Sequence, residues 1–212
     1  KSEVYGFAER FLMASELTYS SLADEVLVSL LRRGDIEAFN EIYDRYSQRL
    51  FFFICRLLHG DKEYAEDLLQ DVFLTLVEHG NMFNTNRKFS TWIFTVTRNK
   101  IKNIYRFREG KAFQSIGNES LSLLLNMPNC VEKNIDVDKF TECLKKELSN
   151  YSEEEKSTFW LRHQEEFSIK EISQILECPE GTVHSRLHNI TKKIAESLTE
   201  YKTLLLENEN EL

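Results

Sequence analysis

The chain has 212 residues, with 27 Lys and Arg against 35 Asp and Glu, and therefore a formal net charge of −8. Only seven Gly and two Pro are present, which argues against an all-β fold with many tight turns and favours helices. No apolar run approaches the roughly 20 residues that span a bilayer, so direct membrane insertion is not expected. The four Cys show no CxxC spacing, which favours reduced thiols over a metal site.

The first predicted helical segment covers residues 35–59, after an N-terminal extension expected over residues 1–24. Its apolar residues recur at steps of three and four, which predicts one buried face: Phe39, Ile42, Tyr43, Tyr46, Leu50, Ile54 and Leu57. Gly60 and Asp61 interrupt this pattern, and a second helix follows with an acidic outer face. The residues expected to point inward from it are Ala65, Leu68, Leu69, Val72, Phe73 and Leu76.

The third predicted helix begins near Ser90, a suitable N-cap, and places Trp92 in the core with its apolar neighbours. Positive charge gathers here, because residues 87–111 hold eight Lys or Arg and one acid, a local charge of +7. The rest of the chain therefore sums to −15. Such segregation of charge is informative in a way that the overall charge of the chain is not.

Residues 112–138 lack helical periodicity and contain Gly117 and Pro128, so we expect a linker here. A stretch of this length without secondary structure is unusual inside a compact domain, and it predicts a domain boundary. The expected organisation is a helical domain over residues 25–111, the linker, a second helical domain over residues 139–200 and an acidic tail over residues 201–212. The overall expectation is an all-α protein with two small helical domains.

The stretch FSIKEISQILECPEGTVHSRLHNITKKIAESL, residues 167–198, predicts a helix-turn-helix. Glu177, Cys178 and Pro179 separate a short amphipathic helix from a longer one, and Pro179 suits the first position of the second helix. Glu177 stands where Gly is commoner, because the backbone of such a turn often needs a positive φ. The polar outer face of the second helix fits a major groove, although an ordinary αα-hairpin with a solvated face fits the periodicity equally well.

Two separated segments resemble a single family. GDIEAFNEIYDRYSQRLFFFICRLL, AEDLLQDVFLTLVE and FSTWIFTVTRNKIKNIYRFR resemble region 2 of bacterial sigma factors. LSNYSEEEKSTFWLRHQEEFSIKEISQILECPEGTVHSRLHNITKKI resembles region 4. Their order, and the lack of a region 3 domain between them, is similar to the extracytoplasmic-function (ECF, group IV) class. The resemblance implies a cytoplasmic promoter-specificity subunit that binds core RNA polymerase, recognises −35 and −10 elements and opens the −10 region, with no enzymatic activity and no cofactor.

The resemblance also implies roles for particular side chains. Asp67, Gln70 and Asp71 are the candidates that bind the β′ clamp helices of core polymerase. The β flap of the polymerase is a further expected contact of the chain. The −10 candidates are Arg98, Asn99, Lys102, Asn103, Arg106 and Arg108. The −35 candidates are Thr182, His184, Ser185, Arg186, His188 and Asn189. The expected partners are core polymerase, promoter DNA and an anti-sigma factor, which in this class is often membrane-anchored.

Two Asn side chains of the basic helix are spaced to lie on the same helical face. Asn99 and Asn103 lie four apart, so both amides can address one nucleotide, and an amide pairs with a base edge through one donor and one acceptor. The charge separation further favours closure of the free chain, with the basic helix against acidic surfaces of the same chain, but the sequence does not determine whether the two domains close.

Two other classes of function compete with this interpretation. A helix-turn-helix regulator would bind duplex DNA without polymerase. An enzyme is not expected, because the sequence has no Gly-rich phosphate loop and no HExxH motif. The pair His184 and His188 has the spacing of two metal ligands but lacks a third.

Overall fold

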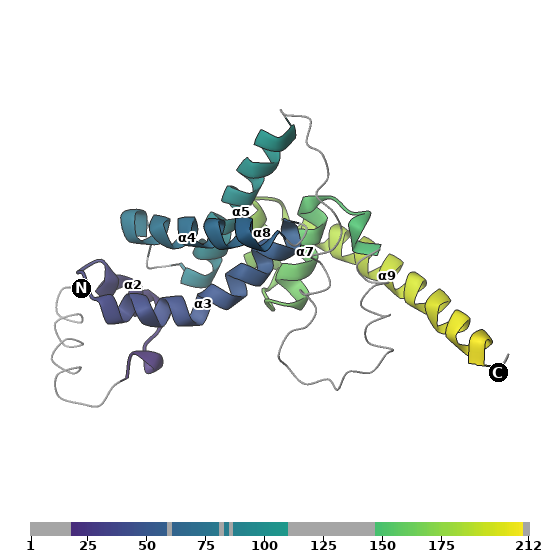
Figure 1. Ribbon diagram of the computed structural model, residues 1–212, viewed down its shortest axis with the longest axis horizontal. Coiled ribbons are helices and arrows are strands. Elements are labelled where there is room, and N and C mark those ends of the chain that lie inside the picture. The colour runs from purple at the N-terminus through teal and green to yellow at the C-terminus, as the bar shows by residue number, and fades with distance from the viewer. Residues whose placement is uncertain (1–17, 59–60, 81–82, 85–86, 110–146, 210–212) are drawn as a thin grey trace.

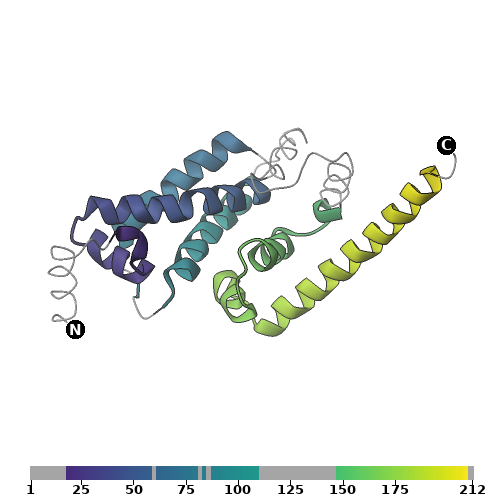
Figure 2. The ribbon, with the colours of Figure 1, turned by 90° about the horizontal axis from the view of Figure 1, so that it is seen from below.

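The structure is a computed structural model that describes residues 18–58, 61–80, 83–84, 87–109 and 147–209, without the side chains of 107–109 and 198–209. Regular structure in these ranges is helical, which confirms the predicted all-α fold. The elements are η1 (Tyr19–Ser21), α2 (Asp24–Leu31), α3 (Ile36–Leu57), α4 (Lys62–His79), α5 (Phe89–Glu109), α7 (Glu153–His163), α8 (Ile169–Leu176) and α9 (Glu180–Glu209). Figure 1 shows α9 extending away from the other helices, and Figure 2 shows α5 between α3 on one side and α7 and α8 on the other.

The N-terminal helices, η1 to α5, pack around the apolar faces of α3 and α4. All six residues predicted to point inward from α4 are buried, and α3 buries Ile42, Tyr46, Leu50, Ile54 and Leu57 as predicted. The prediction for Tyr43 is wrong, since this side chain is 42% exposed. Tyr43 lies at the flank of the stripe, where its ring covers Phe73 from outside at a centroid distance of 4.8 Å. Phe53 and Cys55, which the sequence pattern did not single out, are fully buried.

Helices α3, α4 and α5 begin at carboxylates, but not always at a carboxylate of the same segment. Asp35 accepts the Ala38 N–H at the start of α3, and Asp61 accepts the Tyr64 N–H at the start of α4. The predicted cap of α5 is wrong, because Ser90 lies inside that helix. The Phe89 N–H instead donates a hydrogen bond of 2.9 Å to a carboxylate oxygen of Glu25, which belongs to α2. A tertiary contact thus replaces the local cap.

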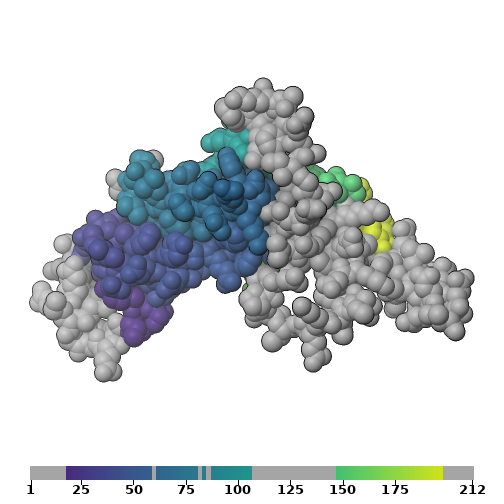
Figure 3. All heavy atoms as spheres, viewed as in Figure 1, coloured from purple at the N-terminus to yellow at the C-terminus, as the bar shows by residue number. Residues whose placement is uncertain are grey.

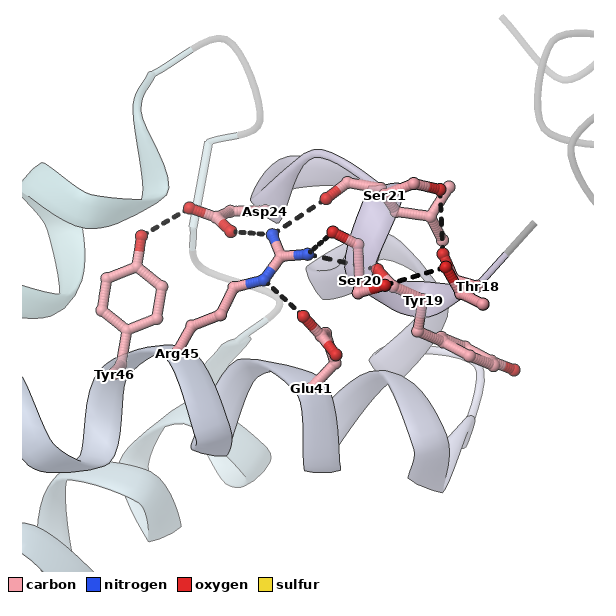
Figure 4. Close-up of polar contacts among 9 residues, drawn as sticks. Thr18, Tyr19, Ser20, Ser21, Asp24, Glu41, Arg45 and Tyr46 are labelled. Carbon is pink, nitrogen blue, oxygen red and sulfur yellow. Dashed lines mark hydrogen bonds and ion pairs between the residues drawn. The ribbon is translucent and has the colours of Figure 1, made fainter.

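Arg45 of α3 fastens the beginning of the described chain to the helical core (Figure 4). Its guanidinium donates to the carboxylates of Glu41 and Asp24, both at 2.7 Å. It also donates to the backbone carbonyls of Leu22, Tyr19 and Ser20 at 2.9, 3.2 and 2.9 Å. Asp24 in turn accepts a hydrogen bond from the hydroxyl of Tyr46. One side chain therefore holds η1 and α2 on α3.

Replacing Arg45 with Met should lower the free energy of unfolding by about 2–3 kcal/mol, because three carbonyls lose a charged donor and Asp24 and Glu41 keep partly buried charges without it. Urea denaturation followed by circular dichroism measures this change. Lys62→Met, at the exposed first residue of α4, is the control and should shift stability by less than about 0.5 kcal/mol. Equal stability of the two variants would contradict the anchoring role.

The C-terminal helices, α7 to α9, are locally well specified. Ser152 with Glu155 and Ser168 with Glu171 form capping boxes at the starts of α7 and α8. The described part of this half begins at residue 147, so the predicted linker over residues 112–138 lies outside the described residues. Helix α9 continues through Glu209, past residue 200 where the second domain was expected to end.

The two halves pack against each other, because one apolar cluster runs through both. It includes Phe53 and Phe94 from the N-terminal helices and Leu161, Phe167 and Ile172 from the C-terminal ones. The rings of Phe94 and Phe167 meet edge to face at 5.1 Å. The closure that the charge separation favoured is therefore present in this structure.

Candidate nucleic-acid and polymerase surfaces

Helices α8 and α9 form the predicted helix-turn-helix. Helix α8 ends at Leu176 and α9 begins at Glu180, so the turn has the three predicted residues, although Pro179 precedes the first helical residue instead of occupying it. Glu177 has φ 53° and ψ 42°, which is the left-handed conformation expected at this position. The turn is held on its inner side by the buried side chains of Ile172, Leu176 and Val183.

Replacing Glu177 with Gly should raise the free energy of unfolding by about 0.5–1 kcal/mol, because Gly adopts a positive φ without the steric cost that a β-carbon brings. Glu177 is exposed, so no packing is lost. Thermal denaturation compares this variant with Gln174→Gly, which places Gly at an exposed position inside α8 and should destabilise by about 1 kcal/mol. Destabilisation by both variants would contradict a strained turn.

The outer face of α9 presents most of the predicted −35 residues to solvent. His184, Ser185, His188 and Asn189 are exposed, whereas Thr182 and Arg186 are half-buried. The Arg186 guanidinium lies beside the turn, with Nη1 3.9 Å from the sulfur of Cys178. Four short polar side chains therefore stand on one accessible helical face, and Arg186 lies at its edge.

Helix α5 divides the predicted −10 residues by accessibility. Asn103 and Arg106 are exposed, and Asn99 and Lys102 are half-buried. The side chain of Arg108 lies outside the described side chains. Arg98 is only 2% exposed, and its Nη2 lies 3.6 Å from a carboxylate oxygen of Glu154 and 4.0 Å from one of Glu153. In this conformation the basic face is thus accessible at Asn103 and Arg106 and covered at Arg98.

The exposed face of α4 combines acidic, amide and apolar side chains. Asp67, Gln70 and Asp71 are exposed, as predicted for a docking surface. Leu74 and Val77 continue the same side of the helix and are 53% and 56% exposed, which the sequence interpretation missed. The available signal was that neither residue belongs to the apolar stripe that ends at Leu76. In the space-filling view, α3 and α4 form a continuous surface (Figure 3).

The two halves of the chain match two regions of one protein family. The family model of Sigma-70 region 2 matches residues 42–110, and the family model of Sigma-70, region 4 matches residues 141–194. ECF RNA polymerase sigma factor SigW of Bacillus subtilis (strain 168) is 26% identical over 172 residues, which cover 76% of this chain and 89% of that protein. ECF RNA polymerase sigma-E factor of Escherichia coli (strain K12) is 26% identical over 182 residues, covering 82% of this chain and 93% of that protein.

The chain belongs to the ECF sigma factors. The predicted family is therefore confirmed, and with it the function of a promoter-specificity subunit. Sigma factors are DNA-binding regulatory subunits.

Solved structures support the fold of this ECF sigma factor. The structure of CnrH in complex with the cytosolic domain of CnrY has a TM-score of 0.61 at 17% identity, covering 84% of this chain and 99% of that one. The sigma factor RpoE in complex with the anti-sigma factor NepR from Bartonella quintana has a TM-score of 0.60 at 21% identity, covering 76% and 96%.

Neither a membrane-spanning helix nor a metal site is found among the described residues of this sigma factor. None of the helices described combines the length and the apolar character needed to cross a membrane. The described His, Cys, Asp and Glu side chains form no group of three that could hold a metal ion.

Burial raises the pKa of the Cys55 thiol to about 11, which keeps this buried side chain protonated at neutral pH.

Proposed function

We propose that the sigma function of this chain is divided among three helical surfaces: α4 binds core RNA polymerase, α9 reads the −35 element, and α5 binds and opens the −10 element. The domains would cover residues 25–111 and 139–200, joined by residues 112–138. The chain acts in the cytoplasm and catalyses no reaction itself. The observation that carries the proposal is the separation of charge, with an acidic exposed face on α4 and a basic C-terminal half of α5 in one anionic chain.

The surface on α4 suits a protein partner better than DNA. Asp67 and Asp71 would repel phosphates, whereas Leu74 and Val77 give it apolar area that a partner can bury. An exposed apolar patch rimmed by polar side chains is typical of a protein interface. We assign this surface to the clamp helices of the β′ subunit, and contacts of the C-terminal helices to the β flap.

The surfaces on α9 and α5 suit different forms of DNA. Short polar side chains on an exposed helix after a three-residue turn can reach base edges in a duplex major groove. Exposed Asn103 beside Arg106 and Lys102 instead offers an amide for a base and cations for the adjoining phosphates. This combination suits a strand whose bases have left the stack.

Two structural relatives form complexes, CnrH with the cytosolic domain of CnrY and RpoE with the anti-sigma factor NepR. We propose that an anti-sigma protein also controls this chain. Such a protein competes with polymerase or DNA for at least one of the three surfaces.

Run-off transcription with purified core polymerase and genomic fragments tests the proposed function. We expect defined transcripts only when both proteins are present, together with permanganate-reactive thymines near −10 in the same complexes. Protection of duplex DNA by the chain alone, without transcripts or permanganate reactivity, would instead identify a helix-turn-helix regulator. Core polymerase without the chain is the matched control.

A further inference from the structure

The contact between the two halves of the chain is polarised in charge. Four basic residues lie on the N-terminal side, and the acidic residues opposite them lie on the C-terminal side. The ion pairs described across this contact are Arg49 with Glu165 at 2.9 Å, Lys88 with Glu171 at 2.7 Å, and Arg98 with Glu154 and Glu153 at 3.6 and 4.0 Å. The guanidinium of the fourth, Arg56, lies 4.7 Å above the ring of Trp160. Charge complementarity of this kind favours one specific docked arrangement.

The carboxylates of this contact are adapted to their cationic partners. Burial raises the pKa of Glu165, and Arg49 and Arg56 oppose that rise. For Glu171, burial alone would raise the pKa, but hydrogen bonds from Lys88 and Ser168 outweigh it and lower the value to about 2. Glu171 therefore stays charged near neutral pH, and its ion pair with Lys88 helps to hold the two halves together.

Arg98 is the most deeply covered cation of the contact. Besides its two distant carboxylate partners, its Nε and Nη1 atoms are buried and make no hydrogen bond. Burial raises the pKa of Glu153, while Arg98 and, more weakly, Lys102 oppose that rise, so the first turn of α7 faces two of the −10 candidates. A guanidinium with two nitrogen atoms unpaired binds less well here than it could bind a phosphate.

Closure affects the two DNA surfaces unequally. On α9, His184, Ser185, His188 and Asn189 remain exposed. On α5, Arg98 is buried beside the acidic first turn of α7, while Lys102 is half-buried and Arg106 stays accessible. The closed chain can therefore present its −35 surface while it withholds part of the −10 surface.

We propose that the first turn of α7, through Glu153 and Glu154, is an intramolecular competitor of DNA that holds the free chain closed over Arg98. Opening replaces these carboxylates with phosphates, and only then is the whole basic face of α5 available. That DNA is the ligand whose phosphates replace these carboxylates rests on the proposed function of α5, whereas the closure of the chain does not. Premature binding of single-stranded DNA away from polymerase is thereby suppressed.

The test uses the full chain with Glu153→Gln and Glu154→Gln. The radius of gyration from small-angle scattering should increase, and the affinity for a fluorescein-labelled single-stranded oligonucleotide of about 16 nucleotides should rise about tenfold. The matched control is Glu63→Gln with Glu66→Gln, which removes two exposed acids from α4 and should leave the radius unchanged and the affinity within about twofold. Adding Arg98→Gln to the first variant should cancel its gain.

A second variant opens the contact at another point, without changing any residue of α5 or α7. Arg49→Glu places an anion against Glu165, whose side chain is 4% exposed, and should produce the same expansion and the same gain in affinity. The charge swap Arg49→Glu with Glu165→Arg should restore the compact form. An unchanged radius in both opening variants would overturn the closure, whereas expansion without a gain in DNA affinity would overturn the assignment of α5 as the covered DNA surface.

Discussion

Replacing Lys102 and Arg106 with Gln and Asn103 with Ala should abolish promoter opening while polymerase association remains intact. Each cation that neutralises a phosphate contributes about 0.9 to the slope of log affinity against log salt, so the slope should fall by about 2. Loss of the Asn103 amide removes a contact that can discriminate bases by about 1–3 kcal/mol. The fraction of open promoter, measured by permanganate reactivity, should therefore decrease at least about tenfold at moderate salt.

The control for this variant removes the same two charges elsewhere. Arg33→Gln with Lys62→Gln changes two exposed cations outside α5 and should leave opening within about twofold. Co-purification with core polymerase separates the two functions, since the α5 variant should be retained as well as the parent. A variant that opens promoters like the parent would refute the role of α5.

Replacing Asp67 and Asp71 with Arg should weaken binding to core polymerase about 100-fold, or about 2.8 kcal/mol. Charge reversal at a complementary surface both removes attraction and creates repulsion, and the two positions lie one turn apart on the exposed face of α4. Leu74→Ser with Val77→Ser tests the apolar part of the same face. This variant should also weaken polymerase binding, because it removes apolar area that the contact would bury. Competition against a labelled sigma factor for core polymerase measures both effects.

The matched control for α4 is Glu37→Arg with Asp44→Arg. These acids are exposed on α3, seven residues apart, and lie outside the proposed docking face. Their reversal should leave polymerase affinity within about threefold, because they lie on another helix and salt screens exposed charges that do not touch the partner. Equal losses in the two charge-reversal variants would show that net charge, and not the α4 surface, governs binding.

Local signals in the sequence specified most of the helices. The apolar period of α4 predicted all six of its buried residues, because helix geometry places positions three and four apart on one face. The turn around Glu177 was equally predictable, since Cys178 and Pro179 interrupt the apolar period and Pro179 suits the start of a new helix. The two SxxE motifs before α7 and α8 form the capping boxes that their spacing indicates, although the sequence interpretation did not use them.

Contacts between distant segments decided what the sequence interpretation got wrong or did not foresee. Ser90 is a good N-cap by its type, yet α5 starts at Phe89 because Glu25 reaches it from another helix. Tyr43 fits an apolar period, yet it remains partly exposed because α3 turns its adjacent stripe toward the core. In both cases the outcome depends on which segment packs opposite, and this is not encoded within one helical turn.

The sequence by itself determined the helical fold, the family and the reservation of positive charge for one helix, because composition, periodicity and charge order are properties of the chain. Charge alone also favoured closure, but it did not say which groups would meet. Only the tertiary structure decided that Arg98 faces Glu153 and Glu154 and that Leu74 and Val77 stay exposed. Accessibility is a property of packed surfaces, so a residue type suited to DNA can lie buried until the halves of the molecule separate.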